Sequence, residues 1–208
     1  GPVEHEYRHV KQTGGRGQYA HAVFHVEPTD PGAGFQFEDT ITGGKISREF
    51  LTAIERGIVA EMAQGPYAGF PMVDVKVTVT DGSMHDVDSS EQAFRTCGRM
   101  GFREACLRAG LQLLEPVMSV EVTVPEEYTG AITSSLCSKR GRVLGMEPKA
   151  GGTVLRGRVP LAEMFGYASE LRNMTSGRGT FTMHFEHYEA VPFAIAEKVI
   201  EERKARDS

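Results

Sequence analysis

A glycine-rich segment and one loop histidine are the residues of this sequence best suited to binding chemistry. The segment from Lys11 to Ala22 reads KQTGGRGQYAHA, and His85 lies in a second loop that reads HDVDSS. Glycines of this kind occur in phosphate cradles, in dinucleotide fingerprints, in hairpin turns and in loops that approach RNA closely. The element that follows the glycines distinguishes these possibilities.

Neither nucleotide-binding motif fits the sequence. The P-loop pattern GxxxxGK[ST] has its nearest approach in ITGGKIS, where Ile46 occupies the hydroxyl position and no glycine stands five residues before Gly44. The run Gly15, Gly17, Ala20 matches GxGxxA, but that fingerprint must open a helix, whereas this run opens a strand. We therefore expect no nucleotide site in this chain.

The remaining histidines and the cysteines do not indicate a metal site. His21 and His25 share a strand face but stand about 13 Å apart, too far for one metal ion. We expect them, and likewise His184 and His187, to be surface or packing residues. Cysteines number three and lack CxxC spacing, so neither a zinc knuckle nor a disulfide framework is expected, and a reducing cytoplasm is favoured.

His85 differs from these histidines because it lies in a loop between a strand end and a helix start. In one interpretation Asp88 and Ser89 cap the helix and His85 is merely exposed. In a second, His85 belongs to a binding site. A third interpretation is a hydrolase that uses His85 with Asp86 or Asp88, but the sequence offers no nucleophile in a strained turn and no evident oxyanion donors.

Two predicted strands position the glycine loop and His85. Residues 19–27 and 72–81 both alternate apolar and polar side chains. The glycine loop precedes the first strand and His85 follows the second, so antiparallel pairing would place the two loops side by side. One end of the domain would then carry the glycines, Lys11, Arg16 and His85, a combination suited to contact with RNA.

The rest of the sequence predicts an α+β protein. A helix is expected over 47–62 behind Ser47 as N-cap, and a second helix is expected to begin at a capping box of Asp88 and Glu91 and to end at Gly110. Pro116 is a reasonable domain boundary. The order βαββαβ follows, as in ferredoxin-like domains, and residues 191–208 are helical by period.

Length and charge limit the kind of partner. The 208 residues, 40% hydrophobic and 25% charged, fit one large or two small globular domains. A net charge of -5 argues against coating nucleic acid through bulk electrostatics, so any RNA contact must be local. No apolar run approaches the ~18 residues that a membrane span needs, and no signal peptide is evident, so we expect a soluble protein.

Six segments carry a family resemblance: HVKQTGGRGQYAH, DGSMHDVDSSEQAF, VEVTVPEEYTG, KRGRVLGM, VPLAEMFGYASELR and TSGRGTFTMHFEHYEAVP. In this order they resemble the last two domains of bacterial elongation factor G, the translocase GTPase. The resemblance runs from about Val10 to Arg203. Thr13 stands where many relatives have Ser, and Ala20 where many have Gly.

This resemblance implies a domain organisation. Residues 1–116 would form the fourth domain, similar to domain 2 of ribosomal protein S5, and residues 117–192 the ferredoxin-like fifth domain. Residues 193–208 would form a helix that packs back on the first domain. The family's GTPase domain is absent from this sequence, so the chain would be non-enzymatic and bind no cofactor, with GTP and magnesium held by the missing N-terminal domain of a longer parent.

The resemblance also implies a ribosomal partner. In that family the tip of the fourth domain enters the small-subunit decoding centre and contacts tRNA and mRNA during translocation, and the fifth domain faces the large-subunit GTPase-associated region. A monomer is expected. A paralogue specialised in ribosome recycling or in displacing an antibiotic is the alternative. By motif match, the tip residues would be Thr13, Gly14, Gly15, Arg16, Gly17, His85 and Asp86, and the rRNA neighbours Lys139, Arg140 and Arg142.

Overall fold

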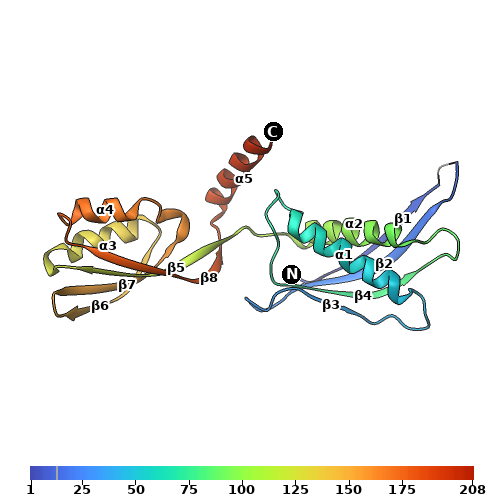
Figure 1. Ribbon diagram of the computed structural model, residues 1–208, viewed down its shortest axis with the longest axis horizontal. Helices are drawn as coiled ribbons and strands as arrows, with labels where there is room; N and C mark the ends of the chain where they lie inside the picture. Colours follow the sequence, from blue (N-terminus) through green and yellow to red (C-terminus); the bar gives the residue numbers. More distant parts are fainter. Residues whose placement is uncertain (13) are drawn as a thin grey trace. The chain divides into compact units, whose positions relative to one another are not determined.

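The computed structural model describes residues 1–12 and 14–208, and its internal contacts divide the chain into two compact units. The first unit comprises Gly1–Gln112 and Glu197–Ser208, and the second comprises Leu113–Ala196. Each unit contains a four-stranded sheet and two helices that pack against it (Figure 1). The predicted α+β class is confirmed.

The sheet of the first unit has the order β1-β2-β4-β3. Pairing is antiparallel between β1 and β2 and between β2 and β4, and parallel between β3 and β4. The strands predicted over 19–27 and 72–81 are confirmed as β2 and β4, whereas β1 and β3 were not predicted. The strand bounds are β1 Val3–Lys11, β2 Gln18–Pro28, β3 Gln36–Asp39 and β4 Val75–Ser83.

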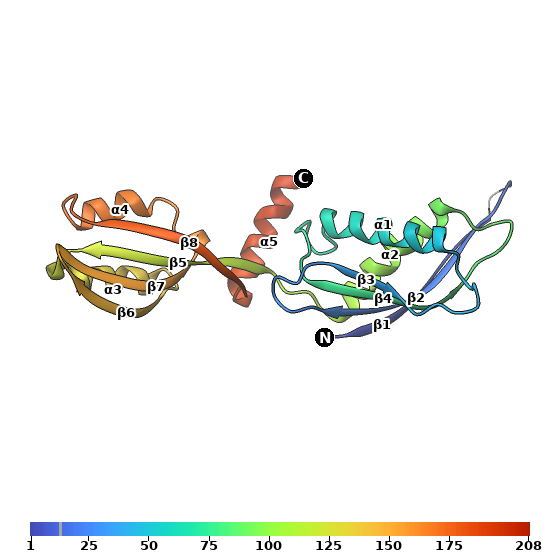
Figure 2. The same cartoon turned by 60° about the horizontal axis from the view of Figure 1, so that its bottom comes forward.

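Helices α1 (Arg48–Gln64) and α2 (Glu91–Ala109) cover one face of this sheet (Figure 2). Ser47 caps α1 as predicted, since its Oγ accepts from the Phe50 N–H at 3.3 Å. The capping box predicted at Asp88 is wrong, because Ser90 caps α2 through the Ala93 N–H at 3.1 Å. The Asp88 carbonyl instead accepts from the Tyr19 N–H at 3.0 Å, which holds Asp88 within the loop.

The core of the first unit lies between the sheet and the two helices. The inward-facing positions of β2 and β4 are buried, including Phe24, Val77 and Val79, which are fully inaccessible. Burial of each such side chain contributes about 1.5–3 kcal/mol. The helices touch through their backbones, because a Cβ atom at Gly57 would overlap the Arg95 carbonyl, and one at Gly98 would overlap the Ile54 carbonyl.

The second unit has the sheet order β6-β7-β5-β8, and all of its pairings are antiparallel. Helices α3 and α4 share one core with the inward-facing residues of β5 and β7. The order βαββαβ and this sheet define a ferredoxin-like fold, as predicted. Its elements are β5 Leu114–Val124, α3 Thr129–Ser138, β6 Arg142–Lys149, β7 Gly152–Pro160, α4 Tyr167–Met174 and β8 Thr180–Ala190, with short 3-10 turns at Glu126–Tyr128 and Leu161–Glu163.

The predicted C-terminal helix is confirmed as α5, Phe193–Asp207. The Arg203 guanidinium donates to the Gly69 carbonyl at 3.2 Å and lies 5.0 Å from the centre of the Phe70 ring. Both partners belong to the first unit. Pro116, where the sequence suggested a boundary, lies inside β5. Among the described residues, no helix is long and apolar enough to cross a membrane.

The close contact between α1 and α2 predicts that even a single added methyl group there destabilises the protein. We expect Gly57→Ala and Gly98→Ala each to lower the free energy of unfolding by at least about 1–3 kcal/mol, because the new methyl group must push the helix backbones apart. Urea unfolding followed by circular dichroism measures this.

Gly130→Ala is the matched control, because Gly130 lies in α3 and an added Cβ there would meet no atom within 4 Å. Alanine favours a helix by about 0.5–1 kcal/mol over glycine, so this variant should be neutral or stabilised. Equal destabilisation by all three substitutions would contradict the contact.

Candidate nucleic-acid interface

The pairing of β2 with β4 brings the two predicted loops together. Its last paired residues are His21 and Ser83, so β2 begins where β4 ends. The Arg16 Nε donates to the Val87 carbonyl at 2.8 Å, joining one loop to the other. The predicted side-by-side placement of the glycine loop and the His85 loop is confirmed, and Figure 1 shows both at one end of the sheet. Thr13 lies outside the described residues.

Ser89 joins these loops through their backbones. The His85 N–H donates to the Ser89 Oγ at 2.9 Å, and the Ser89 hydroxyl donates to the Tyr19 carbonyl at 2.7 Å. The Ser89 side chain is buried, so both hydrogen bonds are shielded from water. The sequence indicates only a helix-capping role for Ser89. Its bonding partner Tyr19 lies in β2, 70 residues earlier, which no local pattern could reveal.

The exposed part of this interface is small and polar. Gly14, Gly15 and Arg16 are exposed on one loop, and His85 and Asp86 are exposed on the other. Gly17 is half-buried, and a Cβ there would stand 3.2 Å from the Asp88 carboxylate. Exposed glycine backbone, one guanidinium and one imidazole supply hydrogen bonds and a stacking surface. These groups can recognise the shape of an RNA without a large positively charged surface.

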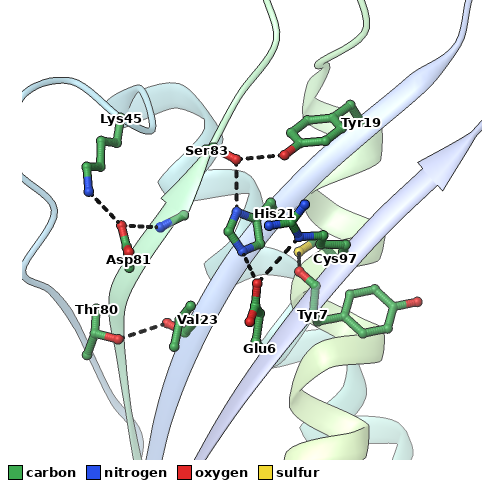
Figure 3. A network of polar contacts seen from close by, with 12 residues as sticks. Glu6, Tyr7, Tyr19, His21, Val23, Lys45, Thr80, Asp81, Ser83 and Cys97 are labelled. Carbon is green, nitrogen blue, oxygen red and sulfur yellow. Dashed lines mark hydrogen bonds and ion pairs between the residues drawn. The ribbon is translucent and has the colours of Figure 1, made fainter.

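Lys45 lies beside these loops and was not predicted. It lines a shallow hollow together with Gly44, Asp81 and Asp86, and its Nζ stands 3.0 Å from the Asp81 carboxylate (Figure 3). The Gly82 N–H, at 2.9 Å, and then Lys45 lower the pKa of Asp81. The ion pair is exposed, so it adds little stability. Proximity of Lys45 to the His85 loop follows from the fold, not from sequence spacing.

Hydrolytic chemistry finds no support in this geometry. Among the described residues, no hydrogen bond joins the His85 ring to Asp86 or Asp88. Burial raises the pKa of Cys97 and of Cys106 to about 12, so both thiols stay protonated at neutral pH and are poor nucleophiles. The described part of the chain contains no cluster of three or more side chains suited to hold a metal ion.

The basic residues predicted in the second unit divide into two groups. Arg140 forms two hydrogen bonds to the Glu115 carboxylate, at 2.6 and 3.0 Å, and one to Glu163 at 3.1 Å. Lys139 pairs with Glu170 at 2.8 Å, and this contact lowers the pKa of Glu170. Arg142 is exposed at the start of β6. Arg142 is therefore the best placed of the three for an external phosphate.

Comparison with known proteins places this architecture in a class. Residues 1–110 match the family described as elongation factor G, domain IV, and residues 112–199 match elongation factor G C-terminus. Domains of this pair, an S5 domain 2-like fold followed by a ferredoxin-like fold, are typical of translational GTPases that act on the ribosome. The chain belongs to the elongation factor G family, of which it contains domains IV and V.

A solved structure supports the same assignment. The chain is similar to a protein from Thermus thermophilus with known crystal structure, at 38% sequence identity and a TM-score of 0.86. The match covers 98% of this chain and 30% of the Thermus chain. This chain therefore spans less than a third of the length of that protein.

The bonds of Ser89 lead to a prediction about the interface. Ser89→Ala leaves the His85 N–H and the Tyr19 carbonyl without their partner, so we expect the free energy of unfolding to fall by about 1–3 kcal/mol. Amide hydrogen exchange at His85 should become faster as the loops separate.

Ser90→Ala is the control, because it removes the cap of α2 and costs about 1 kcal/mol without touching either loop bond. The exchange rate of the His85 amide should then rise only as much as the lower free energy of unfolding explains. If both variants alter this amide equally, Ser89 does not join the loops.

The division of the basic residues is also testable. Arg140→Ala leaves the Glu115 carboxylate unpaired and should lower the free energy of unfolding of the second unit by about 2 kcal/mol. Arg142→Ala should leave the free energy of unfolding within about 0.5 kcal/mol of that of the unsubstituted chain, because Arg142 is exposed. Equal destabilisation by Arg140→Ala and Arg142→Ala would contradict this division.

Proposed function

We propose that this chain is the ribosome-binding part of a factor that promotes GTP-dependent translocation of tRNA and mRNA. The exposed loops around Arg16 and His85 would contact the decoding centre, the tRNA and the mRNA on the small subunit. The second unit would face the GTPase-associated region of the large subunit, with Arg142 as the rRNA contact. GTP and magnesium would be bound by a GTPase domain of the longer factor.

The observation that carries the proposal is the joining of the two loops. Arg16, Ser89 and Tyr19 connect them by hydrogen bonds of 3.0 Å or less, so the exposed glycines and His85 form one surface. RNA recognition at single-stranded or distorted sites depends on such preorganised donors and stacking faces. The net charge of -5 fits a small, shape-selective contact better than general affinity for RNA.

The sequences of the two loops favour translocation over recycling or antibiotic displacement. Both loops, HVKQTGGRGQYAH and DGSMHDVDSSEQAF, stay close to the translocase pattern, with departures at Thr13 and Ala20. A cytoplasmic, monomeric factor without an active site in this part of the chain fits the same function.

His85→Ala in the full-length factor tests this function. We expect single-round translocation to slow by about tenfold, the rate equivalent of one lost hydrogen bond or stacking contact near 1.4 kcal/mol, with ribosome-stimulated GTP hydrolysis nearly unchanged. Stopped-flow fluorescence of labelled mRNA measures the first rate, and phosphate release measures the second.

His25→Ala is the matched control, since His25 lies on β2 but pairs opposite Thr78, away from the loops. It should leave both rates unchanged. Equal loss of translocation and GTP hydrolysis in the His85 variant would indicate a folding defect and contradict the proposal. Loss of subunit splitting with normal translocation would instead favour the recycling alternative.

A further inference from the structure

The imidazole of His85 does not project freely from its loop. Its ring lies on the ring of Tyr19, with the ring centroids 3.6 Å apart and the planes within 4° of parallel. His85 is exposed and Tyr19 is half-buried, so one face of the imidazole rests on the sheet while the residue remains accessible. An aromatic pair of this kind contributes about 0.5–1.5 kcal/mol beyond its buried area.

Tyr19 in turn is held by a chain of hydrogen bonds across three strands. The Tyr19 hydroxyl and the Ser83 Oγ are 2.7 Å apart, and the Ser83 Oγ is 2.8 Å from the His21 Nδ1. The His21 Nε2 is 2.7 Å from a carboxylate oxygen of Glu6. Figure 3 shows this chain running from β1 through β2 to β4. Only about a tenth of the His21 side chain is exposed.

The donors and acceptors of the chain can be ordered from one end. The hydrogen bond from His21 lowers the pKa of Glu6, so this carboxylate is ionised at neutral pH and can only accept. His21 Nε2–H therefore donates to Glu6, and in neutral His21 the Nδ1 accepts from the Ser83 hydroxyl. The Tyr19 hydroxyl then donates to the Ser83 oxygen. This order provides a partner for each of the four groups.

We propose that Tyr19 is a positioning residue for His85, and that Ser83, His21 and Glu6 fix the Tyr19 ring on which the imidazole rests. This inference rests on the proposed function, because it concerns the presentation of His85 to RNA. A free loop side chain loses about 0.5–1.5 kcal/mol of rotamer entropy when a partner immobilises it. Stacking on Tyr19 meets that cost before the partner arrives.

Backbone contacts reinforce the same geometry. Ser89 binds both the His85 N–H and the Tyr19 carbonyl, so the two residues are fixed to each other at the main chain as well as at the rings. The aromatic ring of Tyr19 therefore supplies the stacking surface, and its hydroxyl adds a smaller contribution by fixing the ring. These two contributions can be separated, because Tyr19→Phe removes only the hydroxyl and Tyr19→Leu removes the ring.

The first experiment uses the 208-residue chain alone. Protons held over the face of an aromatic ring resonate upfield, so the His85 ring protons should have upfield NMR shifts in the unsubstituted chain. Tyr19→Leu should abolish the shift, and Tyr19→Phe and Ser83→Ala should reduce it. Tyr188→Leu, which alters an exposed tyrosine of the second unit, should leave it intact. Persistence of the full shift in Tyr19→Leu would overturn the positioning role.

The second experiment measures translocation by the full-length factor. Tyr19→Leu should slow it by up to about tenfold, the rate equivalent of one aromatic pair. The double variant Tyr19→Leu/His85→Ala should be no slower than His85→Ala alone, and Tyr19→Phe should recover most of the rate. If Tyr19→Leu unfolds the chain, Tyr19→Val, which also removes the ring and suits a strand, replaces it in the same comparison.

The outcomes separate this inference from the proposed function. A normal rate in Tyr19→Leu, beside a slow His85→Ala, would overturn the positioning of His85 and leave the proposed function standing. A normal rate in His85→Ala would contradict the proposed function, and with it the role of Tyr19 in translocation, even where the NMR shift behaves as expected. Additive slowing in the double variant would also overturn the inference, because Tyr19 would then act independently of His85.

Discussion

The antiparallel pairing of β2 with β4 is the constraint on which the rest of the first unit depends. Phe24, Val77 and Val79 are buried on the face that the helices cover, and a slip by one residue would turn one strand's apolar side chains outward. With the register fixed, the start of β2 meets the end of β4, and Tyr19 comes to lie against His85. Core packing thus determines how the two loops meet.

Much of this arrangement could be predicted from the sequence, because β2, β4 and α1 carry clear periodicity. β1 escaped prediction because its inward face includes His5 and His9 and its outward face is charged, so apolar alternation is weak there. With four residues, β3 is too short to show a period. Both strands exist because longer neighbours supply the pairing, which is a tertiary effect.

The candidate site shows the same division. The meeting of the two loops followed from strand order, since it needed only one antiparallel pairing. The support beneath His85 did not, because it combines residues from three strands and depends on side-chain direction. Likewise, no local pattern distinguishes Arg140 from Arg142, since Glu115, which binds Arg140, lies 25 residues away. Whether an arginine side chain is free to bind an external group depends on partners that lie far away in the sequence.

The close approach of α1 and α2 at Gly57 and Gly98 has a mechanical consequence. Where two helices meet through side chains, rotamer changes give the joint some compliance. Here backbone meets backbone, so rotamer changes cannot relax the contact. Close-packed interiors transmit strain, so a force applied to the exposed loops should deform this helix layer less than one joined through side chains alone.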